Sequence, residues 1–174
     1  WGCTRDNNTG LTWEVKRAGN ATRDIHKLFY LQPTIGQRTV ADYVGEINGI
    51  ALCGHTDWRL PTVWELYSLL HFGRSNVGFA DPRFFLQSDL TTSFMSSTLN
   101  RYNNNRLIGV QFGGLQSADT GGGTTAVGSF SYVMLVRGEP IVFDSVLNSS
   151  GELVSASWKL AGRICPVPGV YDIG

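Results

Sequence analysis

Residues 55–73, which read HTDWRLPTVWELYSLLHFG, constrain the fold of this chain more than any other stretch. Thr62 and Glu65 have the spacing of a capping box, in which each side chain bonds the backbone N–H of the other residue. Pro61 precedes the cap, and apolar residues follow at helical spacing, at Val63, Leu66, Leu69 and Leu70. We therefore expect a helix that begins after Thr62, buries its leucines and ends at Gly73.

The charged and aromatic residues of the same stretch are open to two interpretations, a binding site or a structural hub. Trp58 and Trp64 are interpreted as apolar bodies packed where the helix meets a sheet. Arg59 is interpreted as one member of an internal ion pair, with Asp57 or Glu65 as its partner. We therefore favour the structural hub and look for functional groups elsewhere.

A helix is also predicted for residues 39–54, with Thr39 as N-cap, Asp42 three residues later and Gly54 just after the helix. Its buried face would comprise Val40, Tyr43, Val44, Ile47 and Ala51. Strands are expected between turn formers, at residues 10–16, 93–99, 106–114, 131–138, 140–147 and 156–166.

Two segments rich in Asn, Gly, Thr and Ser, residues 100–106 and 117–129, are predicted to be loops. The order of elements indicates an α+β fold with two helices, antiparallel strands and long irregular loops. No linker divides the chain, so residues 1–174 are predicted to form a single domain.

Charge and hydropathy exclude several classes of function. The formal net charge is zero, which argues against a nucleic-acid binder that relies on a global basic field. No run of about 18 apolar residues is present, so no membrane insertion is expected. No signal peptide is visible, and the start at Trp1 is interpreted as that of an excised domain or a mature product.

The three cysteines, Cys3, Cys53 and Cys165, allow one disulfide and one remaining thiol, and their spacing matches no metal motif. A Cys3–Cys165 bond is plausible because domain termini often meet, but the residues leave the pairing open. Few lysines and many Asn, Ser and Thr residues favour an extracellular or cell-surface location.

Four motifs occur in one order over residues 1–138: WGCTRDNNTGLTWEVK, DWRLPTVWELYSLL, FMSSTL and YVMLVRG. Together they resemble the family of the C-terminal domain of Legionella collagen-like protein. The resemblance implies a C-type-lectin-like variant fold, distantly similar to the formylglycine-generating enzymes. It also implies a bacterial secreted or surface protein, since the founding member is an adhesin that binds sulfated glycosaminoglycans with this domain assembled as a homotrimer.

No residue pattern indicates an enzyme. The chain has no G-x-S-x-G, H-E-x-x-H or P-loop motif, and its histidines, His26, His55 and His71, are scattered. The formylglycine-generating enzymes use a cysteine pair in their C-terminal part, where this chain has only Cys165. We therefore expect no catalytic residue and no cofactor.

A classical calcium-dependent sugar site is not expected either. Glu139-Pro140-Ile141 and Gln32-Pro33-Thr34 resemble the lectin tripeptides, but each lacks the third oxygen ligand. Calcium prefers six to eight oxygen ligands, so we predict no metal site.

The candidate ligand-binding residues lie in segments 73–85 and 100–107. Arginines suit sulfate or carboxylate, asparagine amides suit sugar hydroxyls, and tyrosine offers a stacking face. Residues 74–107 carry four bases against Asp81 and Asp89, a net charge of +2. The alternative is that the YNNN stretch, residues 102–105, is only a solvated turn. The candidates are Arg74, Arg83, Arg101, Tyr102, Asn103, Asn104, Asn105 and Arg106.

Two functions are compatible with these features. The first is a secreted or surface-displayed bacterial adhesin domain that binds host or environmental glycans, sulfated glycosaminoglycans among them, without calcium. The second is a structural or protein-interaction module at the tip of a pilus or fibre, which would bind surface proteins.

Overall fold

The computed structural model describes residues 1–32, 36–69, 93–100, 103–110, 124–126, 130–147, 149–150, 153–160 and 163–166. For strand residues 103–106, 124–126, 130, 142–147, 153–160 and 163–166 only the backbone is described. The candidate residues Arg74, Arg83, Arg101 and Tyr102 lie outside these ranges, as do Leu70 and Gly73 of the predicted second helix.

The helices form one block between the first three strands and the other strands, and the paired strands are antiparallel, which confirms the α+β prediction. The helices are α1 (Val40–Gly49), η1 (Leu52–Gly54, a 3-10 turn) and α2 (Val63–Ser68). The strands are β1 (Cys3–Arg5), β2 (Thr12–Glu14), β3 (Phe29–Tyr30), β4 (Phe94–Asn100), β5 (Asn103–Val110), β6 (Thr124–Ala126), β7 (Phe130–Ser131), β8 (Val136–Arg137), β9 (Val142–Leu147), β10 (Leu153–Leu160) and β11 (Arg163–Pro166).

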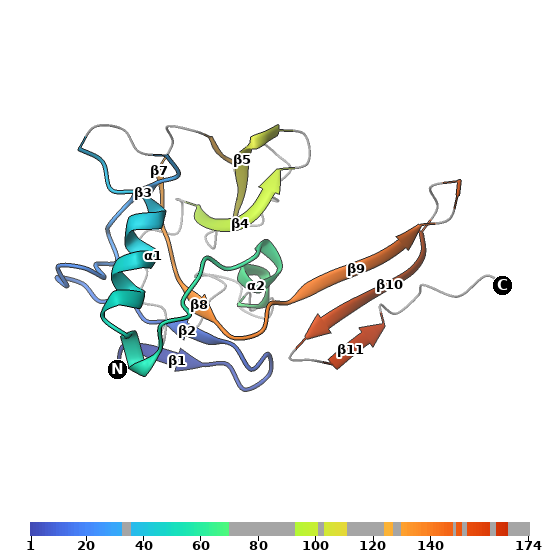
Figure 1. Cartoon of the computed structure of the whole chain (residues 1–174), viewed down its shortest axis with the longest axis horizontal. Helices are drawn as coiled ribbons and strands as arrows, with labels where there is room; N and C mark the ends of the chain where they lie inside the picture. The colour runs from blue at the N-terminus through green and yellow to red at the C-terminus, as the bar shows by residue number, and fades with distance from the viewer. Residues whose placement is uncertain are drawn as a thin grey trace, which may run out of the picture.

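The strands form four small sheets, ordered β1-β2-β8, β3-β7, β4-β5-β6 and β11-β10-β9. Figure 1 shows α1 beside the β1-β2-β8 sheet and α2 between that sheet and the β4–β5 pair. The β9–β11 sheet extends to one side. The body of the domain thus contains both helices and residues from both halves of the chain.

Helix α1 confirms the predicted cap but is shorter than predicted. Thr39 and Asp42 form a reciprocal capping box, and Tyr43 and Ile47 are fully buried. The helix ends at Gly49, and Ala51, rather than Gly54, is the first residue in the left-handed region (φ 48°). The early end allows Leu52 of η1 to enter the core.

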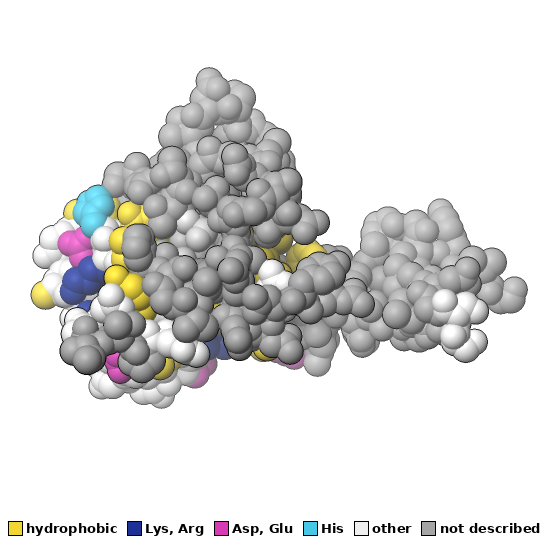
Figure 2. All heavy atoms as spheres, turned by 90° about the horizontal axis from the view of Figure 1, so that it is seen from above, with side chains coloured by type: hydrophobic (Ala, Val, Ile, Leu, Met, Phe, Trp, Pro, Cys, Tyr) yellow, Lys and Arg dark blue, Asp and Glu magenta, His cyan; other side chains and the backbone are white. Residues whose placement is uncertain are grey.

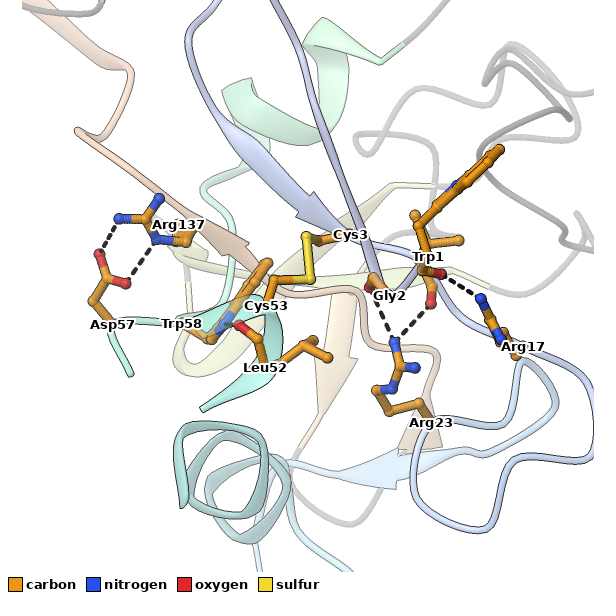
Figure 3. Close-up of a disulfide and its surroundings, with 11 residues drawn as sticks. Trp1, Gly2, Cys3, Arg17, Arg23, Leu52, Cys53, Asp57, Trp58 and Arg137 are labelled. Atoms are coloured by element: carbon orange, nitrogen blue, oxygen red, sulfur yellow. Dashed lines mark hydrogen bonds and ion pairs between the residues drawn. A yellow bond between two sulfur atoms is a disulfide. The ribbon is translucent and has the colours of Figure 1, made fainter. Parts of the chain in front are cut away.

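One disulfide is present among the described cysteines, and it joins Cys3 to Cys53. The Cys3–Cys165 bond considered from the sequence is therefore wrong. Figure 3 shows how β1 brings Cys3 to the turn that follows α1. Cys165 lies in β11, opposite Trp158 of β10, in a different sheet.

Several strand predictions needed correction. Of the predicted loop 100–106, Asn100 belongs to β4 and residues 103–106 belong to β5, and Asn100 pairs with Asn103. Residues 117–129 contain β6, and residues 156–166 are divided between β10 and β11. The predicted strand 131–138 is interrupted, with only its ends in β7 and β8. The short strands β1 and β3 were not predicted at all.

The described core consists of two clusters of buried side chains. One is centred on Trp13, Leu66 and Phe94, and the other on Phe29, Tyr43 and Trp58. Burial of Trp58 (2% exposed) confirms its predicted packing role, whereas Trp64 is 40% exposed and the packing role predicted for it is wrong.

Candidate functional site

Charged residues of the stretch 55–73 form hydrogen bonds with residues far along the chain. Arg59 donates two hydrogen bonds to the Glu65 carboxylate, at 2.8 and 2.7 Å, and a third to the Gly138 carbonyl at 3.1 Å. Glu65 is completely buried and also accepts the backbone N–H groups of Thr62 (2.7 Å) and Ile141 (3.1 Å). The predicted internal ion pair of Arg59 is therefore confirmed, with Glu65 as its partner.

Asp57, the other predicted partner, bonds a different arginine. Its carboxylate accepts hydrogen bonds from Arg137 at 2.7 and 3.1 Å (Figure 3). The hydrogen bonds from Arg137 hold the pKa of Asp57 below its usual value. The Asp57 side chain is exposed, so this pair lies at the surface, with Arg137 at the end of β8.

A second polar cluster, which the sequence did not indicate, lies inside the domain. Glu14 is the last residue of β2 and Lys16 lies two residues beyond it; both are buried, although alternation after the buried Trp13 would place them in solvent. The Tyr43 hydroxyl donates to Glu14, the Lys16 ammonium donates to the Tyr43 oxygen at 2.7 Å, and the Leu135 N–H donates to Glu14 at 3.2 Å.

Burial sets the protonation of this cluster. It lowers the pKa of Lys16 from 10.5 to about 8, against the opposing effect of Glu14 at 3.5 Å. It also raises the pKa of the Tyr43 phenol above its usual range. The hydrogen bonds described for this cluster all join groups within the protein. We therefore interpret the cluster as part of the core.

Of the predicted ligand-binding residues, the structure places only the backbone of Asn103, Asn104, Asn105 and Arg106, all in β5. Arg101 and Tyr102 are the two residues of the sequence that link the paired Asn100 and Asn103. The predicted segment 100–107 therefore belongs to an antiparallel β4–β5 hairpin rather than to a long loop.

The base of this hairpin is fixed to the stretch 55–73. The Ser97 N–H donates to the Pro61 carbonyl at 2.7 Å, and the Val63 N–H donates to the Thr98 hydroxyl at 3.0 Å. Inside the hairpin, the Ser96 hydroxyl donates to the Ile108 carbonyl at 2.7 Å. These bonds attach β4 to the residues that begin α2, up to two residues before β4 ends at Asn100.

The described surface is mixed in charge. Figure 2 shows basic, acidic and hydrophobic side chains next to one another on the described part of one face, rather than a field of one sign. Two arginines of the described surface are engaged with carboxylates, Arg38 with Glu46 and Arg137 with Asp57. An anionic ligand would thus need local groups rather than a general basic field.

The tripeptides that resemble calcium motifs are placed only in part. In Glu139-Pro140-Ile141 the isoleucine side chain is buried in the core. In the other tripeptide, Gln32 is exposed, and Pro33 and Thr34 lie outside the described residues. Within the described ranges, no three His, Cys, Asp or Glu side chains gather in a group that could hold a metal ion.

The fold and the Arg59–Glu65 ion pair define the class of the protein, and a comparison with known families identifies its family. The class is an α+β domain in which a short capped helix and an Arg–Glu pair are hydrogen-bonded to the segment between β8 and β9. The family model of the Lcl C-terminal domain matches residues 2–137, so the chain belongs to that family, as its four motifs predicted. No curated protein and no solved structure gave a significant match.

Residues 138–174 lie outside the family match, and they contain β9, β10 and β11. In the parts of the chain that the structure describes, no helix has the length and apolar character needed to cross a membrane.

Proposed function

We propose that this chain is a secreted or surface-displayed bacterial adhesin domain that binds glycans, sulfated glycosaminoglycans among them, without a classical calcium site and without enzymatic activity. The observation that carries the proposal is the β4–β5 hairpin. Its strand β4 is hydrogen-bonded to Val63 of α2 and to Pro61, and residues 101–106, which link the strands and begin β5, supply two arginines, a tyrosine and three asparagines. Guanidinium groups suit sulfate, and amides suit sugar hydroxyls.

Two further observations support this proposal. Membership of the Lcl C-terminal domain family agrees with a domain of the C-type-lectin-like kind, which we propose as the wider fold relationship. The Cys3–Cys53 disulfide is of a type that persists in oxidising surroundings, which supports an extracellular location. A homotrimer, the arrangement that the family resemblance implied, belongs to the same proposal.

A glycan array that includes heparin and its desulfated form tests the proposal. We expect binding to the sulfated chains, and we expect it to weaken when Arg101 and Arg106 are replaced by alanine. The matched control is Arg5→Ala, because Arg5 is an exposed arginine on β1, away from the β4–β5 hairpin in the sequence. If no glycan on the array is bound, the proposal is wrong.

The second candidate function is a structural or protein-interaction module at the tip of a pilus or fibre. The neutral formal charge of the chain favours it, since protein partners need no basic field. A negative glycan array together with specific capture of one surface protein would establish this alternative. If the domain is strictly monomeric and captures no surface protein, this alternative is excluded.

A further inference from the structure

The turn that follows α1, residues 50–55, holds two non-glycine residues in the left-handed region of backbone conformation. Ala51 has a φ of 48° and Cys53 a φ of 54°, and no other non-glycine residue in the described part of the chain has a positive φ. In this region the Cβ atom of an L-residue comes close to the following carbonyl oxygen, so such residues persist only where surrounding contacts hold them. The backbone strain of the described residues is therefore concentrated in this turn.

Two attachments hold the turn in this conformation. Leu52, between the two strained residues, is buried in the core cluster around Trp58, and its carbonyl accepts the Trp58 indole N–H at 3.0 Å. Cys53 is bonded to Cys3 of β1 by the disulfide (Figure 3). The disulfide is the only covalent attachment of the turn among the described side chains, so its loss would leave the strained residues held by Leu52 and a few hydrogen bonds.

The disulfide is accessible from the side of the turn. Cys53 is exposed, whereas Cys3 is half-buried and packs against the core cluster of Leu52 and Trp58. A thiolate in solvent therefore meets Cys53 first. Disulfides at exposed positions are more readily reduced than those buried in a core, and they are the ones that act in regulation.

The strand at the other end of the disulfide does not depend on it. Cys3 pairs with Glu14 in the β1–β2 ladder. The carbonyl of Gly2 accepts the Val15 N–H at 2.9 Å and the Arg23 guanidinium at 3.0 Å (Figure 3). These bonds hold β1 on its sheet without the disulfide, so breaking the disulfide frees the turn rather than the strand.

We propose that the Cys3–Cys53 disulfide is a redox-sensitive switch. A dithiol reductant opens it, and residues 50–55 then leave their left-handed conformation and release Leu52 from the core, while the rest of the fold stays in place. This inference goes beyond the proposed function and does not depend on glycan binding.

The exchange has two steps. A thiolate of the dithiol attacks the Cys53 sulfur, which forms a mixed disulfide and releases Cys3 as a thiolate that takes up a proton. The second thiol of the reductant then attacks its own sulfur in the mixed disulfide and releases Cys53 as a thiol. The two cysteines gain two electrons and two protons, and the dithiol loses the same number as it closes to a disulfide.

Hydrogen exchange of the wild type, with and without dithiothreitol and without denaturant, tests where the structure opens. The Gly54 N–H donates to Ala51 at 2.7 Å and the His55 N–H donates to Leu52 at 3.1 Å, so both amides report on the turn. We expect reduction to speed exchange in residues 50–58 and to leave α1, β1 and β2 unchanged. Faster exchange throughout the chain would show that the disulfide only supports the fold, and unchanged exchange in the turn would show that nothing opens. Either result overturns the proposal.

The reduction equilibrium of Ala51→Gly tests the role of the left-handed turn. Glycine adopts this conformation without the cost of a Cβ atom, so the variant stabilises the oxidised turn. We expect half-reduction, measured by alkylation of Cys3 and Cys53, to need a ratio of reduced to oxidised dithiothreitol about 5-fold higher than for the wild type. The matched control is Ala18→Gly, because Ala18 is exposed but has no positive φ, and its ratio should equal that of the wild type.

The same equilibrium has one contradicting result. If the turn keeps its conformation after reduction, glycine stabilises both redox states equally, and Ala51→Gly would have the ratio of the wild type. That result would overturn the switch. Glycan binding is measured separately on the oxidised protein, so failure of the proposed function and failure of this inference are distinguishable.

Discussion

At the scale of the residue, two arginine–carboxylate pairs show how burial decides how much an ion pair contributes to the free energy of unfolding. Arg59 faces a fully buried Glu65, whereas Arg137 faces an exposed Asp57. Arg59→Ala would leave a buried carboxylate without its cation, and we expect a loss of about 3 kcal/mol in unfolding free energy. Arg137→Ala, the matched control, should cost less than about 1 kcal/mol. Urea denaturation at pH 7 measures both.

The same pair of variants tests whether Arg59 is structural or a ligand contact. Since Arg59 also bonds Gly138, its loss should loosen the chain where β8 ends, without a selective loss of heparin affinity in the folded fraction. An Arg59→Ala protein of normal stability that no longer binds heparin would contradict the structural role.

Lys16 gives stability a pH dependence of unusual sign. Its pKa is about 8 in the folded protein and 10.5 in the reference state, so the unfolded chain binds more protons between these values and unfolding free energy rises with pH there. The penalty of burying the cation is fully present below pH 8. From pH 7 to pH 9 we expect the wild type to gain about 1 kcal/mol relative to Lys16→Met, which lacks this proton.

Denaturation curves for the two proteins at pH 7, 8 and 9 provide the measurement, and the comparison of slopes cancels the other titrating groups. Arg23 and Arg38 are the other cations that act on Lys16, and Tyr43 stays protonated over this range. Parallel curves for the wild type and Lys16→Met would show that Lys16 does not lose its proton in this range.

At the scale of the element, the helix caps were predictable because their geometry is local. Both capping boxes, Thr39 with Asp42 and Thr62 with Glu65, depend on residues three positions apart. The end of α1 was not predictable, because the left-handed Ala51 follows from contacts of Leu52 and Cys53 with distant residues. The strands predicted at 93–99 and 106–114 correspond to β4 and β5, but β5 begins at Asn103, inside the predicted loop, because strand pairing overrides the turn preference of its asparagines.

The disulfide is the strongest covalent constraint on an element. It closes a separation of 50 residues that includes β2, β3 and α1. In the chain-entropy account, a loop of this length contributes about 4 kcal/mol to unfolding free energy. We expect Cys3→Ser, Cys53→Ser and the double variant to lose the same amount in thermal or urea denaturation. Losses that add in the double variant, or a Cys3–Cys165 peptide in a non-reducing digest, would contradict this pairing.

At the scale of the whole molecule, the sequence predicted the α+β class and the family, because the four motifs occupy the parts that build the core. The network around Glu14 and Tyr43 joins residues 29 positions apart, and nothing in the local pattern indicates it. The ligand-binding candidates rested on residue types alone, and the structure adds the hairpin and its attachment to α2. The single domain over residues 1–174 stays a prediction.

The measurement that tests the central claim most directly is a calorimetric titration of heparin oligosaccharide into the wild type, Arg101→Ala/Arg106→Ala and Arg5→Ala. Our account predicts binding in the micromolar range for the wild type, affinity at least about 10-fold weaker for the double variant, and an unchanged affinity for Arg5→Ala. Absence of binding by the wild type, or equal affinity of all three proteins, would contradict the claim that the β4–β5 hairpin binds glycans.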